Sequence, residues 1–102
     1  MIITQGKVWG IYVLEDTESD VAFYCIGVFN VEHDAYKVKK MILNDIDKHI
    51  DAIEENDEEY FTVDHCSDMN VKKYLINANL NEGIQVRNCK YKIFVSEEVL
   101  YK

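Results

Sequence analysis

The stretch VEHDAYKVKKMILNDIDKHIDAIEE, from Val31 to Glu55, decides the fold. Its apolar residues recur at spacings of three and four, which places them on one side of an α-helix. They form one stripe, made of Val31, Ala35, Val38, Ile42, Ile46, Ile50 and Ile53. Asn30, just before the stretch, is a good N-cap residue. We therefore predict a helix over about 31–55 with one buried face.

Two β-rich segments precede this helix. KVWGIYVL (Lys7 to Leu14) and VAFYCIGVF (Val21 to Phe29) are separated by the polar EDTESD. A six-residue link is too short for a parallel crossover, so the segments predict an antiparallel hairpin. Gly10 and Gly27 lie inside these strands, where glycine often marks a bulge or the close approach of a neighbouring element.

The segment after the helix predicts a strand and then leaves two alternatives open. EYFTVDH, from Glu59 to His65, has the composition of a third strand. Residues 67–80 form either irregular structure or a second helix capped by Ser67 or Asp68. That helix would carry Val71, Tyr74, Leu75 and Ala78 on one face and end before Gly83.

The C-terminal segment IQVRNCKYKIFV, residues 84–95, alternates in its second half. It predicts either one long strand or a tight hairpin at Asn88-Cys89, and the tail SEEVLYK predicts a short helical turn. The expected fold class is therefore α+β: an antiparallel sheet that begins with a β-hairpin, with one long helix packed on one face. A second, short helix is one of the two alternatives left open after residue 66. At 102 residues, we expect a single globular domain over 1–102.

The charge balance excludes several classes of partner. The net charge is −8 and the pI is about 4.7. Binding to nucleic acid depends on neutralising phosphates with Lys and Arg, so direct nucleic-acid binding is not expected. The same reasoning disfavours an anionic membrane surface. A basic protein partner suits an acidic chain of this kind.

The cysteine pattern and the N-terminus predict a cytoplasmic protein, in the host cytoplasm if the chain is phage-encoded. Cys25, Cys66 and Cys89 are odd in number and widely spaced, which is typical of reduced thiols. MIITQGKVWG lacks the charged and apolar regions of a signal peptide. No apolar run approaches the roughly 18 residues of a membrane span.

Motifs with catalytic or ligand-binding chemistry are sparse. There is no phosphate-binding glycine loop or nucleophile elbow, and no cofactor is expected. The histidines and cysteines lack zinc spacing, and the acidic segment lacks the pattern of an EF-hand, so no metal site is expected. Asp64-His65-Cys66 is the most suggestive cluster, because a Cys–His pair can supply a nucleophile and a base. However, adjacent residues on an extended chain point to opposite faces.

The second half of the predicted helix and the residues after it carry a dense run of acid. One base, Lys48, stands among these carboxylates. Acid at a helix C-terminus opposes the macrodipole, and like charges four residues apart repel, so this placement lowers stability. The run forms the predicted partner-binding site: Asp45, Asp47, Asp51, Glu54, Glu55, Asp57, Glu58 and Glu59.

A resemblance supports the expected topology. The block from Ile11 to Ile42 resembles small phage and bacterial domains in which a strand, a polar turn and a strand ending in G-x-F lead into a helix beginning E-x-x-A. The matching residues here are Gly27, Phe29, Glu32 and Ala35, and NEGI at 81–84 is similar to a later step of such domains. The resemblance implies a ββα arrangement and a phage or mobile-element origin. It implies no catalytic residue.

Three accounts of the acidic run lead to different functions. As a solvated face it keeps the protein soluble. As a mimic of a phosphate row it would bind the basic groove of a nucleic-acid-binding protein. That style is similar to small acidic phage inhibitors of host defence nucleases, including some anti-CRISPR proteins. In the third account the long helix, basic in its first half and acidic in its second, pairs antiparallel with a second copy.

The leading hypothesis is a non-enzymatic acidic protein-binding module, a phage-type inhibitor or adaptor of a basic partner. A homodimeric structural or assembly protein, paired through the long helix, is one alternative. A small enzyme that uses Cys66 and His65 is the other.

Overall fold

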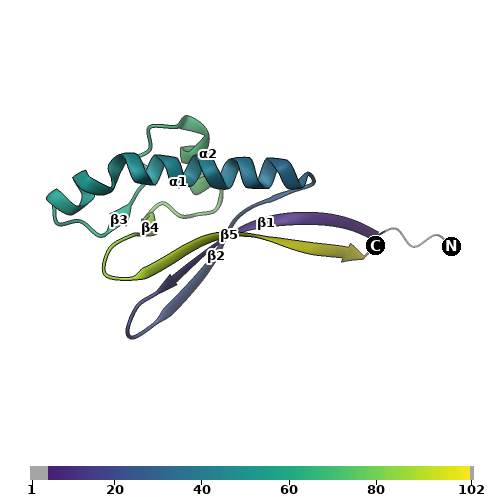
Figure 1. The fold of residues 1–102 in the computed structure, drawn as a ribbon, viewed down its shortest axis with the longest axis horizontal. Helices are drawn as coiled ribbons and strands as arrows, with labels where there is room; N and C mark the ends of the chain where they lie inside the picture. Colours follow the sequence, from purple (N-terminus) through teal and green to yellow (C-terminus); the bar gives the residue numbers. More distant parts are fainter. Residues whose placement is uncertain (1–4, 102) are drawn as a thin grey trace.

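The computed structural model describes residues 5–101. Figure 1 shows two helices over one side of a long, twisted sheet. The elements in chain order are β1 (Gln5–Asp16), β2 (Val21–Phe29), α1 (Glu32–Glu55), β3 (Tyr60–Phe61), α2 (Met69–Asn77), β4 (Ile84–Gln85) and β5 (Lys90–Tyr101). The predicted α+β class, with a hairpin first and one long helix, is confirmed, and the second helix that the sequence left open is present.

The main sheet is antiparallel, with strand order β2-β1-β5. β1 lies in the centre and pairs with β5 from Gln5↔Tyr101 to Asp16↔Lys90. β3 and β4 form a separate two-stranded sheet. The register of β1 against β2 shifts so that Ile11 faces Gly27 and Tyr12 faces Cys25, which leaves Ile26 as a bulge. The glycine at 27 therefore does mark a bulge.

Gly10 allows the close approach of a neighbouring side chain, the second reason for which a strand contains glycine. A Cβ at this position would lie 2.7 Å from ring atoms of Tyr12, because the tyrosine ring lies back over Gly10. The tyrosine hydroxyl donates a hydrogen bond to Glu98 on β5. A side chain at position 10 would displace this ring.

The core lies between the sheet and the helices. The apolar stripe of α1 packs on β1 and β5, and α2 packs on β2, where the rings of Phe29 and Tyr74 are 5.8 Å apart. Fully buried side chains come from every layer: Ile11, Val13, Ala35, Ile42, Ile46, Ile53, Phe61, Val71, Leu75 and Ile84.

The N-terminal cap of α1 differs from the prediction. The N-cap position is Val31, which makes no side-chain capping bond, so the expected cap at Asn30 is wrong. Glu32 and Asp34 occupy the first turn instead, where negative charge suits the macrodipole. At the other end Asp57 adopts φ 55°, and Glu58 N donates to Ile53 O at 2.9 Å, the bonding pattern of a Schellman motif.

The predicted strand over 59–65 is shorter than expected, because β3 covers only Tyr60–Phe61. The chain turns at Thr62, where His65 N donates to Thr62 O at 3.0 Å. The His65 ring in turn accepts from Thr62 N at 2.9 Å, which removes the N–H that a longer strand would use. The hydrogen bond from Thr62 N to the His65 side chain therefore accounts for the end of β3 at Phe61.

The second helix resolves one open alternative. α2 begins after Asp68, whose side chain accepts from Asn70 N at 2.8 Å. Val71 and Leu75 are buried as the predicted face requires. Gly83, beyond the helix, adopts φ 93°, and a Cβ there would collide with the carbonyl oxygen of Phe61. Only glycine lets β4 approach β3 in this way.

Two expectations about the C-terminal segment are wrong. Residues 84–95 form neither one strand nor a hairpin, because β4 pairs with β3 while β5 pairs with β1. Asn88, at φ 60°, turns the chain between them. The tail does not form a helical turn: residues 96–101 continue β5 along β1. Pairing with a distant strand overrode the local preference.

Candidate functional site

The outer side of α1 carries an uninterrupted set of exposed carboxylates. The buried residues Val38, Ile42, Ile46 and Ile53 hold the opposite side against the core. Three- and four-residue spacing therefore forces the acidic residues between them outward. We call the following set the acidic face: Asp47, Asp51, Glu54 and Glu55, all of which are exposed.

The acidic face receives little local compensation. The last turn of α1 contains no basic residue. Lys48 is exposed and lies within the same stretch. On the β5 side, burial raises the pKa of the Tyr91 phenol, and the negative charge of Asp47 raises it further. These carboxylates therefore present their charge to solvent.

Asp45 does not belong to this surface. Its side chain is only 2% exposed and points into the protein. It accepts hydrogen bonds from the backbone N–H groups of Ser67 and Asp68, at 3.1 and 3.2 Å. Asp45 thus fastens the loop before α2 onto α1. The prediction that it contacts a partner is corrected on this ground, because a partner cannot reach the buried carboxylate.

The three acidic residues beyond α1 are partly engaged within the chain. Arg87 Nη1 lies 3.6 Å from Asp57 Oδ1 and donates to the carbonyl oxygen of Glu58 at 2.7 Å. The side chain of Asn88 donates to Glu59 Oε1 at 2.5 Å. Asp57 and Glu58 remain exposed, whereas Glu59 is half-buried. The strongest free charge therefore lies on the helix itself.

The structure does not assemble Cys66 and His65 into a nucleophile and base. The Cys66 thiol points to Thr62 O, 3.6 Å away, and burial raises its pKa to about 11. His65 accepts from Thr62 N through Nδ1, while its Nε2 lies 3.7 Å from Glu58. A thiol with a raised pKa is a poor source of thiolate. Both side chains serve the turn at 62–66.

Sequence reasoning missed a second cluster, in which Ser67 approaches His49 and Asp45. His49 Nε2 is 2.6 Å from Ser67 Oγ and 3.6 Å from Asp45 Oδ1. In a serine–histidine–aspartate triad the serine and the aspartate contact different ring nitrogens. Here both contact Nε2, so the arrangement is not a triad. The spacing of Asp45 and His49, four residues apart on a helix, is the only sequence signal for it.

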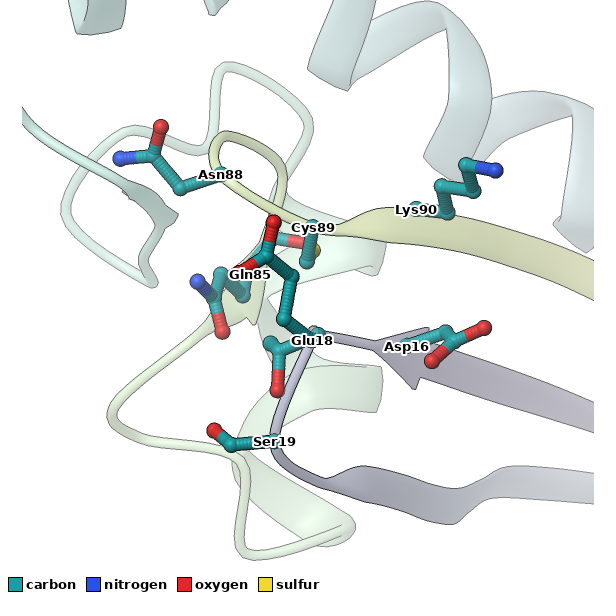
Figure 2. A pocket seen from close by; sticks show the side chains of 8 residues that line it. Asp16, Glu18, Ser19, Gln85, Asn88, Cys89 and Lys90 are labelled. Atoms are coloured by element: carbon teal, nitrogen blue, oxygen red, sulfur yellow. The ribbon is translucent and has the colours of Figure 1, made fainter.

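A surface pocket lies at the tip of the β1–β2 hairpin. In Figure 2, Glu18 points from the hairpin turn toward Gln85 and Cys89. Asp16 and Lys90 lie on the neighbouring strands. The Cys89 thiol donates to Gln85 O at 3.2 Å, and burial raises its pKa. The lining is polar and mixed in charge, unlike the mostly apolar wall of a typical small-molecule site.

Across residues 5–101, no three His, Cys, Asp or Glu side chains gather closely enough to hold a metal ion. No helix in the described part of the chain is both long and apolar enough to cross a membrane. No protein-family model, no curated protein and no solved structure matches the chain.

Proposed function

We propose that the protein is a non-enzymatic binding module whose acidic face engages a basic surface of another protein. The observation that carries this proposal is the set of four exposed carboxylates on the outer side of α1, among which Lys48 is the one base. Asp57 and Glu58 extend the charge beyond the helix end. Adverse charges at a helix terminus lower stability by roughly 0.3–1 kcal/mol each. A set of charges that weakens its own helix favours a role outside the fold.

The spacing of these charges supports a basic groove that binds nucleic acid as the partner surface. Asp47 to Glu55 spans eight steps along the helix, or about 12 Å at ~1.5 Å per residue. Four carboxylates over this length correspond to one charge per roughly 3–4 Å. One strand of DNA carries a charge every ~3.4 Å along the helix axis. The acidic face thus approximates the linear charge density of a single strand.

The proposed role is that of an inhibitor or adaptor of such a partner, in the style of phage proteins that occupy the nucleic-acid groove of a host defence nuclease. The exposed row of carboxylates and the ββα resemblance of residues 11–42 support this role. The geometry at Cys66 and His65 favours the binding role over the enzymatic alternative, because burial raises the pKa of the thiol and both side chains make hydrogen bonds to the backbone of Thr62.

Charge reversal tests the proposal directly. Immobilised protein would be used to capture basic proteins from a bacterial lysate, with mass spectrometry as the readout. We expect the triple variant Asp51→Lys, Glu54→Lys, Glu55→Lys to lose the proteins that the unmodified chain retains. The matched control reverses three exposed carboxylates away from α1, Glu18, Asp64 and Glu82, so both variants have the same net charge.

Competition with duplex DNA distinguishes binding to a nucleic-acid groove from binding to some other basic surface. Duplex DNA should displace the captured proteins if they bind through a nucleic-acid groove, and added salt should weaken capture. Equal retention by both triple variants would refute the acidic face as the contact. Loss of capture in the first variant alone, without displacement by DNA, would keep the acidic contact and reject the nucleic-acid groove.

A further inference from the structure

The side of the main sheet that faces away from the helices carries its own apolar surface. Strand alternation and register place these residues together: Tyr12 pairs with Cys25 and Phe94, and Leu14 pairs with Phe23. In Figure 1 both helices lie over the opposite side of the sheet. We call this surface the open face, and it consists of Tyr12, Leu14, Val21, Phe23, Cys25, Val28 and Phe94.

The open face is separate from the core and strongly exposed at the β2 edge. Val21, Phe23 and Val28 are 59%, 57% and 56% exposed. The rings of Tyr12, Phe23 and Phe94 form a cluster in which all centroid distances fall between 5.2 and 6.0 Å. Contiguous apolar surface of this kind marks interaction sites on soluble proteins. The exposed edge of the cluster is therefore a candidate interaction surface.

The charged strand residues on the open face are balanced in sign. Lys90 and Lys92 lie near the beginning of β5, and Glu98 lies near its end, all three on the open face. Asp16 stands opposite Lys90 in the same row. These four charges sum to zero on a chain whose net charge is −8. The strand residues of the open face therefore add no net repulsion between two copies of an acidic chain.

We propose that a second copy of this chain docks on the open face, sheet against sheet, across a two-fold axis. The axis lies between the two sheets, perpendicular to the strands, and passes over the cross-strand row of Cys25, Tyr12 and Phe94. This axis reverses the strand direction, so the lysine end of each sheet lies over the Glu98 end of the other. A two-fold axis parallel to the strands would instead place β5 over β2, so that Lys90 would face Val21 and meet no opposite charge. Charge complementarity therefore selects the first arrangement.

This docking also separates the two acidic faces. Stacked sheets lie about 10 Å apart, and a helix on each outer side adds a similar distance, so the two α1 helices would be about 30 Å apart. That exceeds the Debye length of ~8 Å at physiological ionic strength several-fold. The acidic faces remain free on opposite outer sides of the pair. The inference is independent of the proposed function, although it would make the module bivalent.

The size of the open face predicts a weak association. From Val8 to Asp16 the face is about 27 Å long, and its three strands are about 14 Å wide. Two such faces bury on the order of 800 Å², below the roughly 1,200 Å² of a standard stable interface. Dimers should therefore form at high micromolar concentration and dissociate on dilution.

Sedimentation velocity over a concentration series provides the first test. We expect the mass to rise from 12.0 kDa toward twice that value as the concentration increases. Phe23→Asp should remain a monomer throughout. Ile76→Asp is the matched control, because Ile76 is an apolar residue on α2 with 44% exposure and lies outside the open face. This variant should dimerise like the unmodified chain. A monomer at every concentration, or equal dimerisation of both variants, would overturn the proposal.

Cross-linking tests the orientation. The proposed axis brings Cys25 of one copy over Cys25 of the other, whereas the parallel axis places β2 over β5. A short bismaleimide should therefore join two copies of the unmodified chain and fail with Cys25→Ser. Cys66 and Cys89 are half-buried with raised thiol pKa values, so Cys25 is the thiol that reacts. Dimers that resist this cross-link would refute the proposed axis.

A charge swap supplies an independent readout of the same axis. Lys90→Glu alone and Glu98→Lys alone should each weaken dimerisation severalfold, because each places like charges opposite one another. The double variant should restore it. Single variants that dimerise as well as the unmodified chain would count against the antiparallel arrangement.

Discussion

Asp45 and Asp47 stand two positions apart on α1 and have opposite environments. Asp47 is exposed on the acidic face, whereas Asp45 is 2% exposed and accepts two backbone hydrogen bonds from the loop before α2. Both are aspartates in the same acidic run, so composition cannot separate them. The side of the helix decides, because one side is covered by the loop and the other is not.

A pair of matched substitutions tests this difference. Asp45→Asn should lower the free energy of unfolding by about 1–3 kcal/mol, because a neutral amide satisfies the N–H groups of Ser67 and Asp68 less well than a carboxylate. Asp47→Asn should change it by less than about 0.5 kcal/mol, as is usual for surface positions. Urea denaturation followed by circular dichroism measures both. Equal effects would contradict the structural role of Asp45.

At the scale of the element, α1 ends in a conformation that its own sequence resists. Asp57 holds φ 55°, a left-handed conformation that glycine adopts freely and other residues rarely do. α2 ends in a similar way, with Asn79 at φ 59° and Leu80 N donating to Leu75 O at 2.9 Å. In both cases a short polar residue stands where glycine is more common.

Replacing that residue by glycine should stabilise the helix end. We expect Asp57→Gly to raise the free energy of unfolding by about 0.5–1 kcal/mol, because the left-handed conformation is unstrained for glycine. Its ion pair with Arg87 at 3.6 Å is on the surface and contributes little. Asp57→Val, which is β-branched, should act in the opposite direction. Thermal denaturation measures the stability change of each variant. If both variants raised the melting temperature, or both lowered it, the left-handed conformation of Asp57 would not explain the result.

At the scale of the whole molecule, several thiol and phenol groups respond to pH in the same direction. The hydrogen bond to Glu98 raises the pKa of Tyr12 to about 12, and burial raises the pKa of Cys66 to about 11 from an ordinary value of 9.0. Burial also raises the pKa values of Tyr24, Tyr60 and Cys89. The folded state thus retains protons that the unfolded chain has already released.

The protein should therefore lose stability in alkali. Between about pH 9 and pH 11 the unfolded Cys66 thiol is deprotonated while the folded thiol is not, so the free energy of unfolding falls as pH rises. The contribution of Cys66 is about 1–2 kcal/mol after allowance for solvent screening, and it is fully retained below pH 9. Urea titrations at fixed ionic strength should show a smaller decline for Cys66→Ala. An identical pH dependence would rule out this thiol.

Local patterns predicted the hairpin and α1 because their signals lie within the segments themselves. The β2 strand is delimited at Val21 and Phe29 by its composition, and the stripe from Ala35 to Ile53 needs only helical spacing. The exposure of Asp47, Asp51 and Glu55 follows from the same spacing. An acidic surface on α1 was therefore predictable before the tertiary structure.

The elements that the sequence misrepresented are those whose conformation depends on a distant segment. Residues 96–101 are strand because they pair with β1, about ninety positions earlier in the chain. Asp45 is buried because the loop at 67–68 folds over it. Periodicity and charge determined the hairpin, the long helix and its acidic side, since these depend on neighbours within a few residues. Only the tertiary structure decided where β5 runs, which carboxylate is withdrawn from solvent and which sheet face stays open, because contacts between distant residues set all three.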